Sequence, residues 1–472
     1  MDNINTLLRE LPAVDRLMRE PLLEELQLKL PRRVVLQAVQ ETIDAYRNNI
    51  TSSSSDQSKL PQAGDLSPEN LASEALVLAE KKAGMNLKPL INATGIIIHT
   101  NLGRAPLSGQ AVKALTDVAA NYSNLELSLE NGKRGSRQEH LENLLCEISG
   151  AEAAIALNNN AAAVFLALNA LAGGLEVVVS RGQLVEIGGS FRIPEIMAAS
   201  GAKLVEVGTT NKTYLRDYEA VVNDDTAAFL KVHASNYHMV GFTAEVETSQ
   251  LAELAHRHNL LLIEDLGSGV FLDLEKYGLP YEPRVQDSIS AGADLVTFSG
   301  DKMLGGPQCG IIVGREGLIA RIRKNQLARA LRIDKFTIAA LEATMRLYLD
   351  EDKAIRDIPV WRMLTVESVT LEKRAKTLAS RFAEIVGSAS VSVVRGVSKV
   401  GGGALPTAEL PTSLVAVKPV EGKAEEIVEK LRLNDPPVIL RLQQEMLLFD
   451  PRTVFEDQED ALVQALKRAY QD

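Results

Sequence analysis

The chain has 472 residues, of which 46% are hydrophobic and 24% are charged, and its formal net charge is −11 at pH 7. This composition is that of a globular protein with a sizeable core, and it excludes a disordered or collagen-like chain. The sequence has no apolar run of the roughly 20 residues that a membrane helix requires, and its first residues, MDNINTLLRELP, do not resemble a signal peptide. The two cysteines, Cys146 and Cys309, lie far apart, which is typical of a reducing cytoplasm and not of a disulfide framework.

Residues 1–88 are predicted to form a helical N-terminal domain. Apolar residues recur there at spacings of three and four, and Pro12, Pro21 and Pro31 divide the first part into short helices. The polar stretch TSSSSDQSKLPQAGDLSPE at 51–69 is the best candidate for a linker, although it could also be a loop inside the domain. Basic residues do not outnumber acidic ones in this segment, so its charge gives no sign of nucleic-acid binding.

Residues 89–345 alternate between apolar runs of strand length and amphipathic helical runs. This alternation predicts an α/β domain in which helices cover both faces of a mostly parallel sheet. Ligands of such sheets bind beyond the carboxyl ends of the strands. The predicted strands are Ala153–Leu157, Glu176–Ser180, Lys203–Val207, Ala227–Val232, Leu260–Glu264, Leu295–Phe298 and Gly310–Val313.

Residues 346–472 are predicted to form a small α+β domain. A long helical segment through Trp361–Val386 comes first. After it we expect strands at Val391–Arg395, Ser413–Val417, Pro437–Leu442 and Glu445–Phe449, and helices at Glu421–Leu431 and Gln458–Tyr470.

The most informative stretch is LVTFSGDKMLGGPQCG, residues 295–310. It begins with a predicted buried strand, and a turn rich in serine and glycine follows, which contains Lys302. Partial desolvation of a lysine at such a position lowers its proton affinity and makes its amine a usable nucleophile. A Schiff-base lysine for pyridoxal 5′-phosphate (PLP) needs this property, and Ser299 is placed to reach the cofactor phosphate. Taken alone, the stretch fits an ordinary surface lysine better.

Two further predicted strand ends favour a PLP-binding lysine over an ordinary surface lysine at position 302. Asn159, Asn160 and Ala161 lie between a predicted strand and a predicted helix, where backbone amides bind phosphate, although an asparagine there is also an ordinary N-cap. Asp265 ends another strand before Gly-Ser-Gly and can pair with a pyridinium nitrogen, and a turn aspartate or a Mg²⁺ ligand are the alternatives. A phosphate loop, an aspartate and then a lysine, all at strand ends of one sheet, form the layout of fold-type I PLP enzymes.

Seven segments carry a family resemblance that covers nearly the whole chain. They are LRELPAVDRLM (8–18), INATGIIIHTNLGRAPLS (91–108), NNNAAAV (158–164), SRGQLVEIGGSFRIPEIM (180–197), KVHASNYHMVGF (231–242), SGDKMLGGPQCG (299–310) and LLFDPRTV (447–454). These segments resemble bacterial selenocysteine synthases, the L-seryl-tRNA(Sec) selenium transferases. The resemblance implies a cytoplasmic, PLP-dependent homodecamer, a pentamer of dimers, whose N-terminal domain contacts tRNA. It also implies conversion of seryl-tRNA(Sec) to selenocysteinyl-tRNA(Sec) with selenophosphate, through loss of water to a dehydroalanyl-tRNA intermediate and then addition of selenium.

The resemblance also assigns roles to individual residues. Lys302 would hold PLP, Asp301 would assist catalysis beside it, and Asn236 in HASNY would belong to the cofactor site. The selenium donor would be bound by arginines at three positions: Arg104, Arg329 and Arg332. The last two are three residues apart, so we expect them to share a helix face and to form a fork for a tetrahedral oxyanion. Without the resemblance, solvated helix arginines and a turn asparagine would be the better interpretations.

Two positions depart from the family pattern. Cys309 stands where a small residue is expected, and we interpret it as a packed, small apolar side chain. His238 stands where the family often has a basic residue, which leaves its local contact open. His256 and His258 are two apart on a predicted helix and face different ways, and we predict no metal site.

Two other functions remain as alternatives at this stage. A PLP-dependent lyase or eliminase would act on a small free amino acid without tRNA, and a scaffold protein would have kept the fold without the cofactor. The helical N-terminal domain favours a tRNA substrate. The intact lysine, aspartate and phosphate loop argue against the scaffold.

Overall fold

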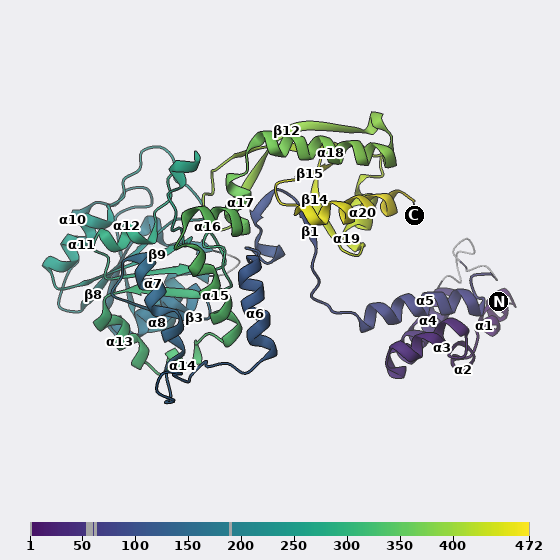
Figure 1. Cartoon of the computed structure of the whole chain (residues 1–472), viewed down its shortest axis with the longest axis horizontal. Coiled ribbons are helices and arrows are strands. Elements are labelled where there is room, and N and C mark those ends of the chain that lie inside the picture. Colours follow the sequence, from purple (N-terminus) through teal and green to yellow (C-terminus); the bar gives the residue numbers. More distant parts are fainter. Residues whose placement is uncertain (1, 53–59, 61–63, 188–190, 472) are drawn as a thin grey trace. The chain divides into compact units, whose positions relative to one another are not determined.

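The computed structural model describes residues 2–52, 60, 64–187 and 191–471 (Figure 1). The chain divides into two compact units, Met1–Pro89 and Leu90–Asp472. Most of the predicted linker, at 53–59 and 61–63, lies outside the described residues, as do residues 188–190 of the segment 180–197.

The described part of the N-terminal unit is helical, as its periodicity predicts. The prolines mark the helix boundaries, since Pro12 lies between α1 and α2, Pro21 begins α3, and Pro31 precedes α4. Proline lacks a backbone N–H and is therefore tolerated at the first turn of a helix but not in its interior. One apolar core, which includes Leu17 and Leu71, joins α2 to α5, and a smaller cluster of Leu7, Ile50 and Leu66 holds α1. Their bounds are α1 (Asp2–Glu10), α2 (Val14–Leu17), α3 (Pro21–Lys29), α4 (Arg32–Ser52) and α5 (Pro68–Ala83).

A seven-stranded sheet lies at the centre of the second unit. Its strand order is β3-β11-β10-β9-β8-β4-β7, and all neighbours are parallel except β11, which runs antiparallel to both β10 and β3. The prediction of a mostly parallel sheet is therefore confirmed. The strands are β3 (Ala153–Leu157), β4 (Glu176–Ser180), β7 (Lys203–Val207), β8 (Thr226–Val232), β9 (Leu261–Gly267), β10 (Leu295–Ser299) and β11 (Gly310–Gly314).

Helices cover both faces of this sheet (Figure 1). Successive residues of β3 enter different cores, because Ala154 and Ala156 face one core while Ile155 and Leu157 face the other. In the described parts of the chain, no helix is both long enough and apolar enough to cross a membrane. The helices of this region are α6 (Gly109–Ala120), α7 (Glu142–Ser149), α8 (Asn160–Ala172), α9 (Ile193–Ser200), α10 (Leu215–Glu219), α11 (Thr248–Arg257), α12 (Val285–Ser290), α13 (Glu316–Lys324), α14 (Leu327–Ala330), α15 (Lys335–Leu347) and α16 (Glu351–Asp357). Two short strands, β5 (Glu186–Ile187) and β6 (Phe191–Arg192), pair antiparallel with each other.

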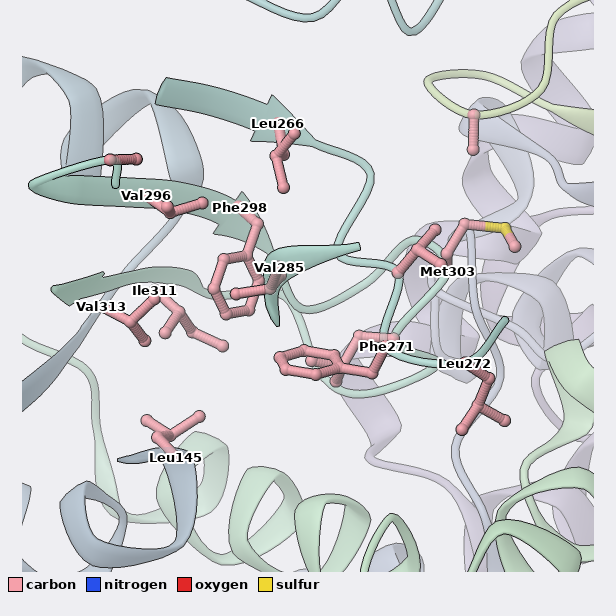
Figure 2. Close-up of a cluster of buried hydrophobic side chains, with 14 of the residues drawn as sticks. Leu145, Leu266, Phe271, Leu272, Val285, Val296, Phe298, Met303, Ile311 and Val313 are labelled. Carbon is pink, nitrogen blue, oxygen red and sulfur yellow. The ribbon is translucent and has the colours of Figure 1, made fainter. Parts of the chain in front are cut away.

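The turn after β10 is anchored in the larger of these cores (Figure 2). Phe298 packs edge-on against Phe271, with ring centroids 5.4 Å apart. Met303 and Leu304 are fully buried, and the backbone N–H of Met303 donates to the carbonyl of Ser268 over 3.0 Å. The residues on either side of Lys302 are therefore held rigidly.

The C-terminal part contains a second sheet, in the order β1-β14-β15-β13-β12-β2. Its outer strands β1 (Ile91–Ala93) and β2 (Ile96–Ile98) come from the start of the unit, and the sequence did not reveal them. The predicted single helical segment is wrong, because the backbone is extended at Val366 and Glu367 and separates two helices. The bounds here are α17 (Pro359–Thr365), α18 (Ser368–Val386), β12 (Val391–Gly401), β13 (Leu410–Val417), α19 (Ala424–Leu433), β14 (Val438–Gln443), β15 (Met446–Phe449) and α20 (Glu459–Gln471).

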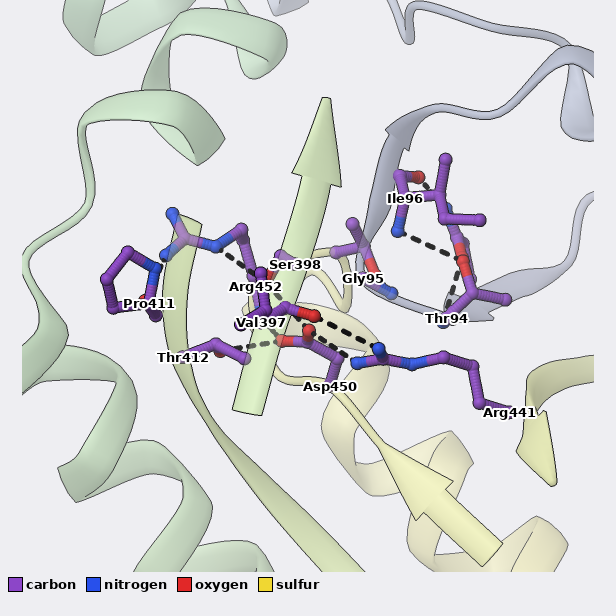
Figure 3. Close-up of polar contacts among 12 residues, drawn as sticks. Thr94, Gly95, Ile96, Val397, Ser398, Pro411, Thr412, Arg441, Asp450 and Arg452 are labelled. Atoms are coloured by element: carbon purple, nitrogen blue, oxygen red, sulfur yellow. Dashed lines mark hydrogen bonds and ion pairs between the residues drawn. The ribbon is translucent and has the colours of Figure 1, made fainter. Parts of the chain in front are cut away.

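A buried carboxylate ties this second sheet together (Figure 3). Asp450, in the segment LLFDPRTV, accepts hydrogen bonds from Ser398 on β12 over 2.7 Å and from Thr412 on β13 over 2.9 Å. Arg441 Nη2 donates over 3.2 Å to Oδ2, the same oxygen that accepts from Ser398, while Thr412 donates to Oδ1. The backbone N–H of Gly95 donates to Thr453, so the same segment also holds the loop between β1 and β2. This part of the family resemblance therefore has a structural role.

Candidate active site

Lys302 lies in the turn after β10, and 5% of the residue is exposed. Two glycines at positive φ enclose its amine. A Cβ atom at Gly403 would lie 2.6 Å from Lys302 Nζ, and one at Gly267 would lie 3.5 Å away. Gly403 belongs to the segment between β12 and β13, so the C-terminal part of the chain forms one wall of the lysine site.

Burial lowers the pKa of the Lys302 amine. The negative charge of Asp265 opposes this effect, and the positive charge of Arg104 adds to it. Because removing an ammonium group from water disfavours its charged form, the neutral amine forms more readily here than in an exposed lysine. The desolvated lysine predicted from the sequence is therefore present.

Asp265 is a second buried ionisable group of the site, with 3% of the residue exposed. It lies near the end of β9, opposite Thr297 of β10, and its Oδ1 accepts from Thr297 Oγ1 over 2.9 Å and from Asn160 Nδ2 over 2.8 Å. Burial raises the pKa of Asp265, while these two hydrogen bonds and the charge of Lys302 act in the opposite direction. A cationic ring nitrogen beside this carboxylate would stabilise its charged form.

The segment Asn159–Ala161 lies where β3 leads into α8. Asn159 is the N-cap of the helix, and its side chain accepts from the N–H of Ala162 over 2.8 Å. Asn159 therefore acts as the N-cap of α8. Asn160 reaches across to Asp265, and the helix that begins there has 13 residues, so its first N–H groups and its dipole favour an anion.

Asp301 and Arg104 form an ion pair beside Lys302. Arg104 Nη1 lies 2.8 Å from Asp301 Oδ2, and the N–H of Ala105 donates to the Asp301 carbonyl over 3.2 Å. Arg104 adopts a left-handed backbone conformation with φ of 61°, which a residue with a side chain rarely takes. The loop after β2, which contains Arg104, is therefore held against the turn that contains Lys302.

Our prediction that Arg329 and Arg332 share a helix face is wrong. Helix α14 ends at Ala330, and Arg332 instead forms an isolated bridge with Leu157, the last residue of β3. The N–H of Asn158 donates to the carbonyl of Leu331 over 2.9 Å, so this backbone pairing competes with a further helical turn. Arg332 consequently lies next to the N-terminal end of α8, while Arg329 stays on the exposed helix.

Asn236 and Ser299 are placed differently. Asn236 is exposed, and its side-chain amide donates to the carbonyl of Glu186 over 2.9 Å. Ser299 is buried at the end of β10. Cys309 is 1% exposed and its sulfur packs against Gly300, which agrees with our interpretation of a packed apolar side chain.

Four buried oxygens around Lys302 lack a hydrogen-bond partner among the described residues: Asn160 Oδ1, Ser235 Oγ, Ser268 Oγ and Asp301 Oδ1. Unsatisfied buried polar atoms are uncommon in proteins, and a group of them indicates a place for a polar ligand. Together with the buried lysine and carboxylate, they fit PLP. No cluster of His, Cys, Asp or Glu suited to a metal ion occurs within the described parts of the chain.

Comparison with known proteins decides the family. Residues 90–455 match the family model described as L-seryl-tRNA selenium transferase, and residues 8–47 match the model described as selenocysteine synthase N terminal. The chain belongs to the L-seryl-tRNA selenium transferase family. The L-seryl-tRNA(Sec) selenium transferase of Moorella thermoacetica is 48% identical over 466 residues, which cover 98% of this chain and 97% of that protein. The protein of the same name from Clostridium botulinum (strain Okra / Type B1) is 46% identical over 462 residues, 98% of each chain.

Among solved structures, D-glucosaminate-6-phosphate ammonia-lyase has a similar fold. Its TM-score is 0.57 at 22% identity, and the match covers 83% of this chain and 98% of that one. The fold-type I class predicted from the sequence is confirmed.

Two residues that border Lys302 or its neighbours were not among the candidates predicted from the sequence. Ser235 is fully buried, and its Oγ would lie 3.7 Å from a Cβ at Gly267, the glycine that also borders Lys302. Ser235 immediately precedes Asn236 in HASNY, so the segment singled out from the sequence also supplies this buried serine. Gly403 has no local signal in the sequence, because its contact with Lys302 joins positions about a hundred residues apart.

Proposed function

We propose that this chain converts L-seryl-tRNA(Sec) to L-selenocysteinyl-tRNA(Sec), with PLP as cofactor and selenophosphate as selenium donor. The observation that carries the proposal is the family match over nearly the full chain, at 46% and 48% identity to proteins of that name. The buried pair of Lys302 and Asp265 supports it, because the reaction needs a lysine that can lose its proton and a carboxylate for a ring nitrogen.

Lys302, Asp265 and Asn160 would hold PLP, with the N-terminal end of α8 at its phosphate. Bound there, PLP would supply an electron sink for loss of the seryl α-proton and of the β-hydroxyl. The lowered pKa of Lys302 suits its amine to accept the α-proton as a general base. Asp301, which contacts Arg104 and lies next to Lys302 in the chain, would assist.

The selenium donor carries negative charge and therefore needs cationic partners. Arg104 is preoriented by its ion pair with Asp301 and is 30% exposed, so it can still contact a ligand. Arg332 lies beside the start of α8, and its side chain is 45% exposed. Arg329, an exposed residue of α14, would be the third cationic partner.

The N-terminal helical unit would contact the tRNA, and the chain would work as a cytoplasmic homodecamer. Support for the first point comes from the match of residues 8–47 to the N-terminal model of selenocysteine synthase. The acidic balance of the whole chain means that tRNA contacts would depend on a local cationic face and would weaken with salt.

The direct test is formation of selenocysteinyl-tRNA by the PLP-loaded full chain with seryl-tRNA(Sec) and selenophosphate. Lys302→Ala should abolish the product, while Lys324→Ala, an exposed lysine in the last turn of α13, should leave it unchanged. Seryl-tRNA(Ser) and free serine serve as comparison substrates. Turnover of free serine with no reaction of seryl-tRNA(Sec) would replace the proposal with a small-molecule lyase.

A further inference from the structure

A cleft of about 640 Å³ lies at the carboxyl ends of β8 and β9, on the side covered by α11. It adjoins the lysine site at two places. His233 lines the cleft, and its N–H donates to the carbonyl of Asp265 over 2.9 Å. Leu405, Pro406 and Thr407 also line it, and they follow Gly403, which packs on Lys302. The volume falls within the roughly 300–1,000 Å³ typical of small-molecule sites.

One residue that lines the cleft, Glu264, has an unmet hydrogen-bond acceptor. Glu264 is 2% exposed, and its Oε1 accepts from Thr248 Oγ1 over 3.0 Å. Lys231 Nζ donates to the same hydroxyl over 2.9 Å and lies 3.8 Å from Glu264 Oε1. Glu264 Oε2 has no partner among the described residues, although it is buried. A buried carboxylate oxygen without a donor is costly, so a ligand that supplies an N–H or O–H would stabilise it.

The remaining carboxylates of the cleft determine which ligands are excluded. Glu282 Oε1 lies 3.0 Å from His233 Nε2, and Glu245 accepts from Gln183 over 2.8 Å. Carboxylates outnumber lysines along the lining, which disfavours phosphate groups. Tyr281, at 61% exposure, offers an aromatic face beside these polar groups. The cleft therefore suits an uncharged, flat ligand with amine or hydroxyl donors.

We propose that this cleft binds the terminal adenosine of the aminoacyl-tRNA, with an amine or hydroxyl of that nucleoside donating to Glu264 Oε2. The inference rests on the proposed function, because seryl-tRNA must bring its 3′ end, where the serine is esterified, to Lys302. The adjoining cleft disfavours phosphate, accepts hydrogen bonds and offers an aromatic ring for stacking. These properties match the nucleoside at the 3′ end of the tRNA and not its phosphate backbone.

The binding test uses adenosine as the probe on the PLP-loaded full chain, measured by saturation-transfer NMR, with uridine and spermidine for comparison. Ser249 lines the cleft from an exposed position in α11, so Ser249→Phe should fill the cleft without disturbing the core. Its neighbour Gln250 is exposed and outside the cleft, which makes Gln250→Phe the matched control. Adenosine should bind wild type and the control but not Ser249→Phe. Adenosine binding that survives Ser249→Phe, or a cleft that takes spermidine and not adenosine, would overturn the inference.

A kinetic measurement separates this inference from the proposed function. Ser249→Phe should raise KM for seryl-tRNA(Sec) about tenfold with little change in kcat. Glu264→Gln should weaken adenosine binding about tenfold, because the glutamine amide puts an N–H donor opposite the donor of the ligand. An active wild type whose KM is unchanged in Ser249→Phe would refute the cleft assignment alone. A wild type that binds adenosine in the cleft and makes no selenocysteinyl-tRNA would refute the proposed function alone.

Discussion

Asn160 donates a 2.8 Å hydrogen bond to Asp265, so the first residue of α8 contacts the carboxylate of β9 directly. The two ends of the proposed cofactor site, its helix N-terminus and its ring carboxylate, are therefore joined by one amide. Thr297 of β10 donates to the same oxygen and fixes the carboxylate from the other side.

We expect Asp265→Asn to stabilise the cofactor-free protein near neutral pH while weakening PLP binding. Burial raises the pKa of Asp265, so the folded chain holds this proton more tightly than the unfolded chain, whose ordinary value is 3.8. The stability linked to this group is full below 3.8 and is lost as pH rises through the raised pKa. Thermal unfolding at about pH 4 and about pH 7 should show the gain at the higher pH only. A loss of stability near pH 7 would mean that hydrogen bonds and Lys302 outweigh burial.

Gly403→Ala should reduce activity at least about tenfold and lower PLP occupancy, because its Cβ would lie 2.6 Å from Lys302 Nζ and displace the amine. Gly422→Ala is the matched control, since Gly422 also has positive φ but would meet nothing within 4 Å. Borohydride trapping of PLP on the protein, followed by mass spectrometry, gives the occupancy. Equal losses in both variants would point to backbone strain and not to contact with the lysine.

Arg104→Ala should raise KM for selenophosphate by about tenfold or more, because a charge-assisted contact to the donor is lost. Asp301→Asn should also raise this KM, since it frees Arg104 from the 2.8 Å ion pair that orients it. Arg321→Ala, an exposed arginine of α13, is the control. Steady-state kinetics with varied selenophosphate at saturating seryl-tRNA(Sec) measures the effect. An unchanged KM in Arg104→Ala would remove this residue from the donor site.

Gly95→Ala should destabilise the second unit by about 2–4 kcal/mol, because the new Cβ would overlap the carboxylate of Asp450 at a position with positive φ. Gly132→Ala, which has positive φ but no neighbour within 4 Å, should cost much less. Thermal or urea unfolding of the two full-length variants compares them. Similar midpoints would show that the Asp450 network yields to the methyl group.

The sequence predicted the seven strands of the central sheet because most of them are short apolar runs, the pattern of strands buried on both faces. The edge strand β7 (KLVEV) is an exception, since it contains charged residues and is only partly buried. Lys302 and Asp265 could be recognised because their residue types are unusual at the ends of such strands. Strands β1 and β2 have three residues each, too few to show a period of two. They form only because distant strands pair with them.

The positions of Arg332 and Gly403, which the sequence did not reveal, have a common cause. The end of α14 depends on a bridge between Arg332 and Leu157, and the wall beside Lys302 depends on Gly403, so both are set by contacts across more than a hundred positions. Asn236 is exposed while Ser235 is buried, and no alternation marks that loop. Local patterns locate the segments of the site but not the side chains that meet.

The pairing of Ile91 with Val438 has a consequence for the order in which the chain can fold during synthesis. A ribosome has released the whole seven-stranded sheet before it makes β14, so β1 must wait, unpaired, for most of translation. Gly403 also emerges about a hundred residues after Lys302. The lysine therefore faces water until the last quarter of the chain arrives, and the cofactor site is completed only in a nearly finished polypeptide.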